Sequence, residues 1–488
     1  VRLRAMSDNG FDLAASARAE MIHEGFSPDF PPEIAKEVEE IVRRPAVDAY
    51  SVRDLRAFLW SSIDNETSRD LDQIEVAERT AEGVRVRVGI ADVDATVASG
   101  SAIDAHARSQ TTSVYTHVRT FPMLPSELST GITSLNEGQD RVAVVMDFVV
   151  DARGGVTRVE VYRALVRNRA QLTYEGVGPW LEGSAEAPKK VAAWPGLESQ
   201  LRWQDEAAAA LRMGRREAGA LEFERVESRP IVSDGKVEGI GVRRKNRASA
   251  LIEDFMVAAN QVMARTLEAA GVASIRRVVR SPERWPRIVE LARRNGCRLP
   301  EEADSRALSA FLVERRAADP LHYADVSLAV MKLMGPGEYV MVRPGEDGDG
   351  HFGLATHDYT HSTAPNRRFA DVVTQRLVKA AIDRAAPPYS EDELAAIARN
   401  CTLKEDAARK VERTMNKRLA AVALAGRIGE SFDAVVTGVR PKGVFVRVVN
   451  PPVEGRLMRG EHGLDVGDTI RVRLCDVDVE QGFIDFER

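Results

Sequence analysis

Three aspartates that could act together, Asp64, Asp70 and Asp72, fall within one short stretch of the chain. Asp70 and Asp72 flank the apolar Leu71, so in an extended backbone both carboxylates point to one face and Leu71 packs on the other. The polar loop 65–69 lets Asp64 return to that face. Carboxylates with no His or Cys nearby are ligands for magnesium or manganese, not for zinc. The spacing therefore favours a hard-cation site, and a solvated acidic turn is the alternative.

Apolar patterns on both sides of the aspartates indicate the elements that must position them. The apolar segment 58–60 comes before the cluster. After it, apolar residues alternate with polar or small ones from 84 to 90, which predicts a strand. Much farther along, 251–260 is typical of a buried helix that also carries acidic residues.

The composition is that of a globular protein with more than one domain. The chain has 488 residues, 44% of them hydrophobic and 29% charged. The net charge is -6, so any RNA site must be a local basic channel. We expect no secretory leader and no membrane span. The chain has three cysteines, Cys297, Cys401 and Cys475, which lie far apart in the sequence. An odd number of distant cysteines argues against a disulfide framework and favours a location in the reducing cytoplasm.

A small helical module, a large mixed α/β (α+β) domain and a C-terminal barrel are expected, in that order. Residues 1–50 contain predicted helices at 12–21 and 33–44, which could form a helix-turn-helix or a packing module. Residues 51–427 form one large region without short repeats. Residues 428–488 alternate as strands of a small barrel.

The barrel sequence predicts an outer face suited to nucleic acid. Its strands are expected at 432–439, 444–449 and 469–475. The valines of 444–448 pack inward, which leaves an aromatic ring and three cations outside: Phe445, Arg440, Lys442 and Arg447. Such a face can stack bases and follow phosphates. An ordinary β-module with one exposed ring is the alternative.

Collinear motifs make the large domain resemble the catalytic domain of the ribonuclease II (RNB-domain) family. The resemblance starts at Ser62-Ile63-Asp64 and Asp70-Leu71-Asp72 and continues to the segment 359–371. Shorter matching segments follow in the family's order: 113–115, 121–125, 128–129, 133–135, 140–141, 172–174, 219–223, 251–260 and 351–354. The barrel resembles the RNA-binding OB fold of the ribosomal S-one type that commonly ends such chains. One departure is clear, because Gln73 stands where the family has its fourth aspartate.

The resemblance implies a processive 3′-to-5′ exoribonuclease that hydrolyses single-stranded RNA to nucleoside 5′-monophosphates with magnesium, or manganese. Asp64, Asp70, Asp72 and Gln73 would surround the metal, with Asp70 and Asp72 as catalytic carboxylates. Asp72 would orient the attacking water. Arg367 would contact the scissile phosphate, which its planar guanidinium suits. Gln73 offers an amide oxygen without a charge, which leaves the number of metals open.

The resemblance also implies a set of RNA contacts around that centre. Two aromatic residues, Tyr115 and Phe223, would stack terminal bases. Tyr174 and Glu253 would lie near the ribose. Glu412 would contact the 3′ end, and Arg368 a phosphate. A helix-surface ion pair is an equal alternative for Glu412. For Arg367 and Arg368 the alternative is a solvated helix start, although cations disfavour that position and an anion partner explains them better.

Two other functions stay open at this stage. One is an RNA-binding protein that keeps the fold but has lost activity, with Gln73 marking the loss. The other is a regulator that acts through its N-terminal helices on a protein or DNA partner. The three clustered aspartates and Arg367 favour the enzyme. Without a metal the like charges would repel one another, so a protein that had lost activity would gain nothing by keeping them together.

The stretch before Asp64 is expected to be helical and is too short for the two cold-shock barrels that family members commonly carry there. A channel mouth without those barrels could let a duplex approach more closely. We therefore expect an enzyme that can enter structured RNA from a 3′ overhang. Separately, we expect it to be a monomer.

Overall fold

A computed structural model describes residues 11–43, 52–223, 227–233, 236–243, 245–320, 323–346, 348–440 and 443–488. Lys442 and the side chain of Arg440, both expected on the outer face of the barrel, lie outside this description.

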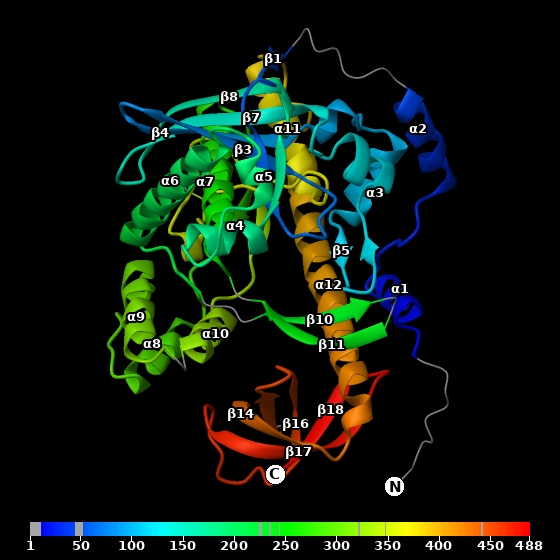
Figure 1. The fold of residues 1–488 in the computed structure, drawn as a ribbon, viewed down its shortest axis with the longest axis vertical. Coiled ribbons are helices and arrows are strands. Elements are labelled where there is room, and N and C mark those ends of the chain that lie inside the picture. The colour runs from blue at the N-terminus through cyan, green and yellow to red at the C-terminus, as the bar shows by residue number, and fades with distance from the viewer. Residues whose placement is uncertain are drawn as a thin grey trace.

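A seven-stranded sheet forms the centre of the large domain (Figure 1). Its order is β1-β8-β7-β4-β3-β2-β9, antiparallel except for the parallel edge pairs β1–β8 and β2–β9. The strands are β1 (Arg53–Asp54), β2 (Ser61–Asp64), β3 (Gln73–Thr80), β4 (Gly83–Ala91), β7 (Asp140–Val150), β8 (Val156–Arg167) and β9 (Ala170–Thr173). The strand expected from the alternation at 84–90 is confirmed by β4.

The two faces of the sheet are covered unequally. One face packs on α4 (Tyr174–Leu181), α6 (Leu197–Ala218), α7 (Arg247–Ala269) and α11 (Phe369–Ile382), whose apolar residues join the main core. The other face carries a smaller cluster around Trp60, Leu71 and Tyr162. The buried helix expected at 251–260 is confirmed by α7, which opens on a capping box formed by Asn246 and Ser249.

A 34-residue helix, α12 (Glu391–Leu424), links the catalytic region to the barrel, as Figure 1 shows. Its final residues Ala421 and Leu424 belong to the barrel's hydrophobic core. The expected N-terminal helices are confirmed by α1 (Leu13–His23) and α2 (Pro32–Arg43). They pack on different parts of the catalytic region, α1 on α12 and α2 on α3 (Ala102–Gln110).

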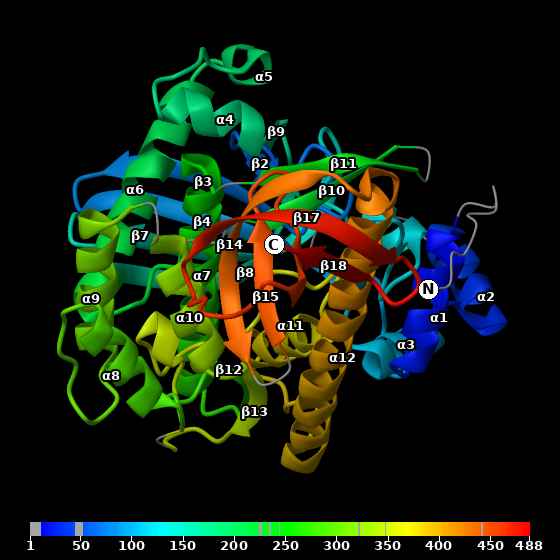
Figure 2. The ribbon, with the colours of Figure 1, turned by 90° about the horizontal axis from the view of Figure 1, so that it is seen from below.

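The C-terminal segment closes into a five-stranded barrel of order β14-β15-β16-β18-β17. Its strands are β14 (Ser431–Arg440), β15 (Gly443–Val448), β16 (Glu454–Arg459), β17 (Thr469–Asp478) and β18 (Phe483–Glu487). The predicted alternation is confirmed, because Val444, Val446 and Val448 are buried while Phe445 and Arg447 are only half-buried. In Figure 2 the barrel lies in front of the catalytic region, with α8 (Trp285–Arg294) and α9 (Ser305–Ala318) to one side and α1 and α2 to the other.

The smaller elements complete the catalytic region. They are β5 (Val114–Tyr115), β6 (Thr120–Phe121), β10 (Glu227–Ser233), β11 (Lys236–Arg243), β12 (Ser274–Val278), β13 (Glu338–Val342), α5 (Lys189–Ala192), α8 (Trp285–Arg294), α9 (Ser305–Ala318) and α10 (Tyr323–Leu333). Helices α8 to α10 share a satellite core. Among the described helices, none is both long and apolar enough to cross a bilayer.

Candidate active site

A cavity of about 460 Å³ opens where β2 ends and β3 begins. Segments far apart in the chain line it: Asp64, Asn65, Ser68, Asp70, Asp72, Gln73, Tyr115, Tyr174, Ser249, Ile252, Glu253, Met256, Thr363 and Arg367. The four expected metal-site residues, Asp64, Asp70, Asp72 and Gln73, are therefore brought together with Arg367.

Local hydrogen bonds fix the first two aspartates of the cavity. Asp64 is the last residue of β2, and its Oδ1 accepts from the Asn65 N–H at 2.7 Å and from the Ser68 hydroxyl at 2.8 Å. Asp70 Oδ2 accepts from the Tyr115 hydroxyl at 2.8 Å. Between the aspartates of the Asp-Leu-Asp motif, Leu71 is buried in the smaller core cluster. Each aspartate thus keeps oxygen lone pairs for a further ligand.

Asp72 is the buried aspartate of the cavity, with 2% of its surface exposed. Its Oδ1 accepts from the Asn366 backbone N–H at 2.9 Å, and its Oδ2 lies 3.4 Å from Arg367 Nε. Burial raises the pKa of Asp72 to about 7, although Arg367 and the Asn366 N–H act in the opposite direction. Asp70 and Asp371 raise this pKa further, because like charges disfavour ionisation.

The adjacent arginines Arg367 and Arg368 have different surroundings. The Arg367 side chain is 47% exposed and points to the cavity. Arg368 caps α11, and its guanidinium binds the fully buried Asp371 at 2.8 Å. Asp371 Oδ1 also accepts the Ala364 N–H at 2.8 Å, so it shapes the turn that presents Arg367. The expected anion partner exists for both arginines, but Arg368 does not line the cavity.

Tyr115 reaches the cavity from the two-residue strand β5. Its backbone N–H donates to Glu412 of α12 at 3.3 Å, while its hydroxyl donates to Asp70. Burial, and then the Asp70 charge, raise the pKa of the Tyr115 phenol, which keeps it a hydrogen-bond donor. Glu412 therefore supports Tyr115 from behind, and burial raises the pKa of Glu412.

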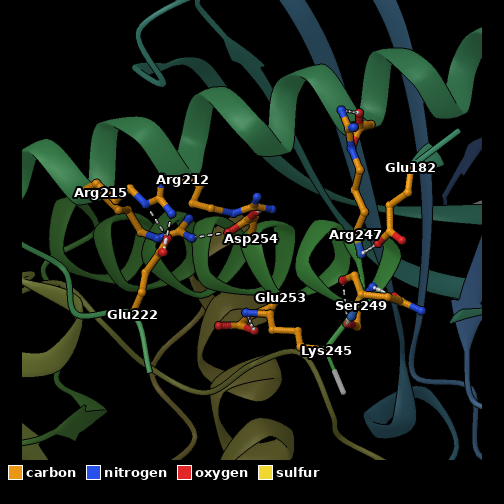
Figure 3. Close-up of polar contacts among 12 residues, drawn as sticks. Glu182, Arg212, Arg215, Glu222, Lys245, Arg247, Ser249, Glu253 and Asp254 are labelled. Atoms are coloured by element: carbon orange, nitrogen blue, oxygen red, sulfur yellow. Dashed lines mark hydrogen bonds and ion pairs between the residues drawn. The ribbon is translucent and has the colours of Figure 1, made fainter. Parts of the chain in front are cut away.

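Helix α7 presents one acidic residue to the cavity and another to its neighbouring helix. Figure 3 shows Glu253 paired with Lys245, while Asp254 points the other way to Arg212 and Arg215 of α6. Glu253 lines the cavity together with Tyr174, whose carbonyl accepts the Asn246 side-chain N–H at 2.8 Å. Asn246, the N-cap of α7, therefore links Tyr174 to the helix that carries Glu253, and these are the two residues expected near the ribose.

Besides Glu412 and Arg368, three more of the expected RNA contacts are not part of the cavity lining. Phe223 packs on the satellite core of α8 to α10. Phe445 and Arg447 lie on β15 of the barrel. Their roles toward RNA stay predictions, as does that of Lys442, which is outside the described residues.

Sequence reasoning missed two polar residues beside the cavity. Asn366 is 1% exposed, and besides its N–H bond to Asp72 its Oδ1 accepts from the Thr133 hydroxyl at 2.5 Å. Glu75 is fully buried on β3, and burial, with a smaller effect from Asp64, raises its pKa well above the usual range. A glutamate among the apolar residues of an inner strand is a signal that could have been read from the sequence.

The donors of the cavity fit a hard divalent cation. Its described lining offers carboxylate, amide and hydroxyl oxygens and includes no His or Cys. Four carboxylates, those of Asp64, Asp70, Asp72 and Glu253, line the cavity with Arg367, so acidic side chains outnumber cationic ones in its described lining. Asp64, Asp70, Asp72 and the Gln73 amide oxygen would hold such an ion, as magnesium and manganese prefer.

Known proteins match this chain in both of its sequence domains. Residues 52–384 match the RNB domain, and residues 430–488 match the RNase II-type exonuclease C-terminal S1 domain. Ribonuclease R of Thermotoga maritima is 31% identical over 440 residues, which cover 88% of this chain and 61% of that protein. The chain thus spans less than two thirds of that relative.

Solved structures agree in fold over nearly the whole chain. Mycoplasma genitalium RNase R superposes with a TM-score of 0.87 in complex with ribose methylated single-stranded RNA and 0.85 with double-stranded RNA. These two matches have 22% and 23% identity, and each covers 98% of this chain, with 78% and 83% of the other chain. Yeast Ssd1, described as a pseudonuclease, matches with a TM-score of 0.70, 15% identity, 91% of this chain and 55% of that chain. With an RNB domain over most of its length and an RNase II-type S1 barrel after it, the chain belongs to the RNB-domain family.

Proposed function

We propose that the protein is a hydrolytic 3′-to-5′ exoribonuclease that degrades RNA processively to nucleoside 5′-monophosphates and depends on magnesium, or manganese. The observation that supports this function best is the convergence of Asp64, Asp70, Asp72 and Arg367 on one cavity. Phosphodiester hydrolysis needs a positioned water and stabilisation of charge on the phosphate, and these side chains can provide both.

The chain's own residues would divide the work as follows. Asp72 is held at Oδ1 by the Asn366 N–H, and its Oδ2, which also lies 3.4 Å from Arg367 Nε, would orient a water toward the phosphorus. Arg367 donates to the phosphate oxygens from the half-exposed side of the cavity. Tyr174 and Glu253 line the same cavity and would contact the ribose. A bound divalent cation would add Lewis-acid polarisation of the phosphate.

The substrate would be single-stranded RNA, or structured RNA with a 3′ overhang. The fold neighbour from Mycoplasma genitalium was solved with both single-stranded and double-stranded RNA, which supports this breadth. The active form would be a monomer. A cytoplasmic location agrees with three unpaired cysteine thiols.

A time course on end-labelled RNA tests this function. A 5′-labelled single strand should shorten stepwise from its 3′ end with magnesium and stay intact with EDTA. Products should be nucleoside 5′-monophosphates, identified by chromatography. A second substrate, a duplex with a single-stranded 3′ tail, should be shortened into the duplex, and a stop well before the first base pair would refute the structured-RNA part alone.

An RNA-binding protein without activity is the second candidate, and Gln73 is the observation that favours it. An amide in place of a carboxylate removes one charge from the metal site. The same protein would then bind the labelled strand and leave it uncut with either cation. Binding without cleavage in that time course would decide for this alternative.

A further inference from the structure

Glu75 lies on the same face of β3 as Gln73. Side chains two apart on a strand point the same way, with their Cα atoms roughly 7 Å apart. This face packs toward the main core, since Ala77 follows on the same side and belongs to it. Across the sheet, Glu75 pairs with Ser61 of β2 and Val88 of β4. Glu75 therefore sits directly behind the cavity residue Gln73.

The Glu75 carboxylate has no evident structural task. Its residue is fully buried, and among the described residues neither of its oxygens has a hydrogen-bond partner. A buried polar group without a partner destabilises a fold by about 1–3 kcal/mol, and more when charged. Strand β3 would be more stable with an apolar residue at this position, so a function is the better explanation for a glutamate.

Gln73 needs help to serve a cation. Its amide carries an oxygen that can bind a metal and an NH₂ group that donates hydrogen bonds. Around it, Asp64, Asp70 and Asp72 line the same cavity. Three carboxylates attract the NH₂ group, which would turn the amide oxygen away from the ion. An acceptor on the far side of Gln73 removes this conflict.

We propose that Glu75 is a positioning residue of the divalent-cation site: when a cation is bound, Glu75 accepts an N–H of the Gln73 amide and so turns the Gln73 oxygen toward the cavity. This inference rests on the cation site of the proposed function. Both side chains are long and flexible enough to span their separation. Acceptors behind a ligand commonly fix its orientation and strengthen its donor atom.

Ser61 offers a competing explanation that can be tested separately. Its hydroxyl lies opposite Glu75, and within the described chain it too is buried without a hydrogen-bond partner. If Glu75 served only to accept from Ser61, its role would be local packing. Ser61→Ala would then disturb the site as much as a change at Glu75.

Manganese binding to the full-length chain without RNA tests the inference, with free Mn²⁺ measured by electron paramagnetic resonance. Glu75→Gln leaves a weaker acceptor that carries an NH₂ group of its own, and it should raise the Kd for Mn²⁺ by about 10-fold, the lower end of the usual effect of disturbing such a supporting group. Ser61→Ala, the matched control, should leave this Kd unchanged. In a Gln73→Asp background, Glu75→Gln should have little effect, because there is no amide left to orient.

Two results would overturn the inference. One is an unchanged Mn²⁺ Kd in Glu75→Gln. The other is an equal loss of affinity in the Gln73→Asp background, which would separate Glu75 from Gln73. Thermal unfolding in EDTA adds a second measurement: Glu75→Gln should not lower the Tm, since it removes a buried carboxylate without a partner, and a lowered Tm would assign Glu75 a structural role.

The measurement also separates this inference from the proposed function. If the wild-type chain binds Mn²⁺ but cleaves no RNA, the exoribonuclease fails while the role of Glu75 is still decided by binding. If the chain cleaves RNA and Glu75→Gln keeps the wild-type Kd, only the role of Glu75 fails.

Discussion

The catalytic cavity and the outer surface of the barrel both gather charged side chains, but they balance the charges differently. In the cavity, four carboxylates share one space, and Arg367 is the cation near Asp72, at 3.4 Å. On the barrel, charges are exposed and locally paired, as in the contact of Arg473 with Glu487. Exposed pairs contribute little and need no ligand.

This difference indicates where a ligand is required. Carboxylates held together in a half-buried cavity repel one another, so the fold loses stability until a cation enters. The charges on the barrel surface need no ligand to balance them. We expect this surface to add only a modest affinity for RNA, and one that falls as salt rises. We expect changes in the cavity to affect turnover, and changes in the barrel to affect RNA affinity.

The largest expected effect is at the buried carboxylate Asp72. Asp72→Asn keeps the shape of the side chain but removes the charge that would orient water, so kcat should fall by about 10²-fold to 10⁴-fold. RNA affinity in EDTA, measured by fluorescence anisotropy, should stay near that of the wild type. Turnover close to the wild-type rate would show that Asp72 is not needed for hydrolysis, and the cavity would then not be the site that sets the rate.

Arg367 should come next, with Arg368 as its matched control. Arg367→Lys replaces a planar fork by a point charge, and single-turnover cleavage should slow by roughly 10²-fold to 10³-fold with an unchanged Tm. Arg368→Met should instead destabilise the fold by about 3–5 kcal/mol, since it leaves the buried Asp371 unpaired. Equal kinetic effects without a loss of Tm would show that both arginines contact the phosphate.

The barrel should give a smaller effect of a different kind. Phe445→Ala should weaken single-stranded RNA binding by about 1–3 kcal/mol if the ring stacks on a base. The cleavage rate at saturating RNA should not change, because the barrel is separate from the cavity. Val449→Ala, also on the barrel and exposed, is the control and should leave the affinity unchanged. A lower cleavage rate at saturating RNA would show that the barrel also contributes to the cleavage step.

Tyr115 should give the smallest effect and sharpen the comparison within the cavity. Tyr115→Phe keeps the ring but removes the hydrogen bond to Asp70, worth about 1 kcal/mol. Because Asp70 would be held less firmly, the magnesium concentration for half-maximal rate should rise by about fivefold. RNA affinity should stay the same, and Tyr115→Ala should lower it if the ring stacks.

Local patterns in the sequence were sufficient for much of the fold. The alternation that predicted β4 and the inward valines of β15 is confirmed, because a strand's side chains alternate whatever surrounds it. The buried helix at 251–260 is confirmed for a similar reason, since its apolar period is local. The motifs also indicated the cavity residues Asp64, Asp70, Asp72 and Arg367, because residue type and order carry that information.

Tertiary structure alone decided how these residues are used. Arg367 and Arg368 are neighbours of one type, and only the packing of α11 on the core turns one to the cavity and the other to Asp371. Glu75 is one glutamate among many in the sequence, and only the sheet places it behind Gln73 without a partner. The physical reason is that burial and partnership depend on how distant segments pack, as where the Asn366 N–H meets Asp72 from 294 residues away, and no local period encodes such packing.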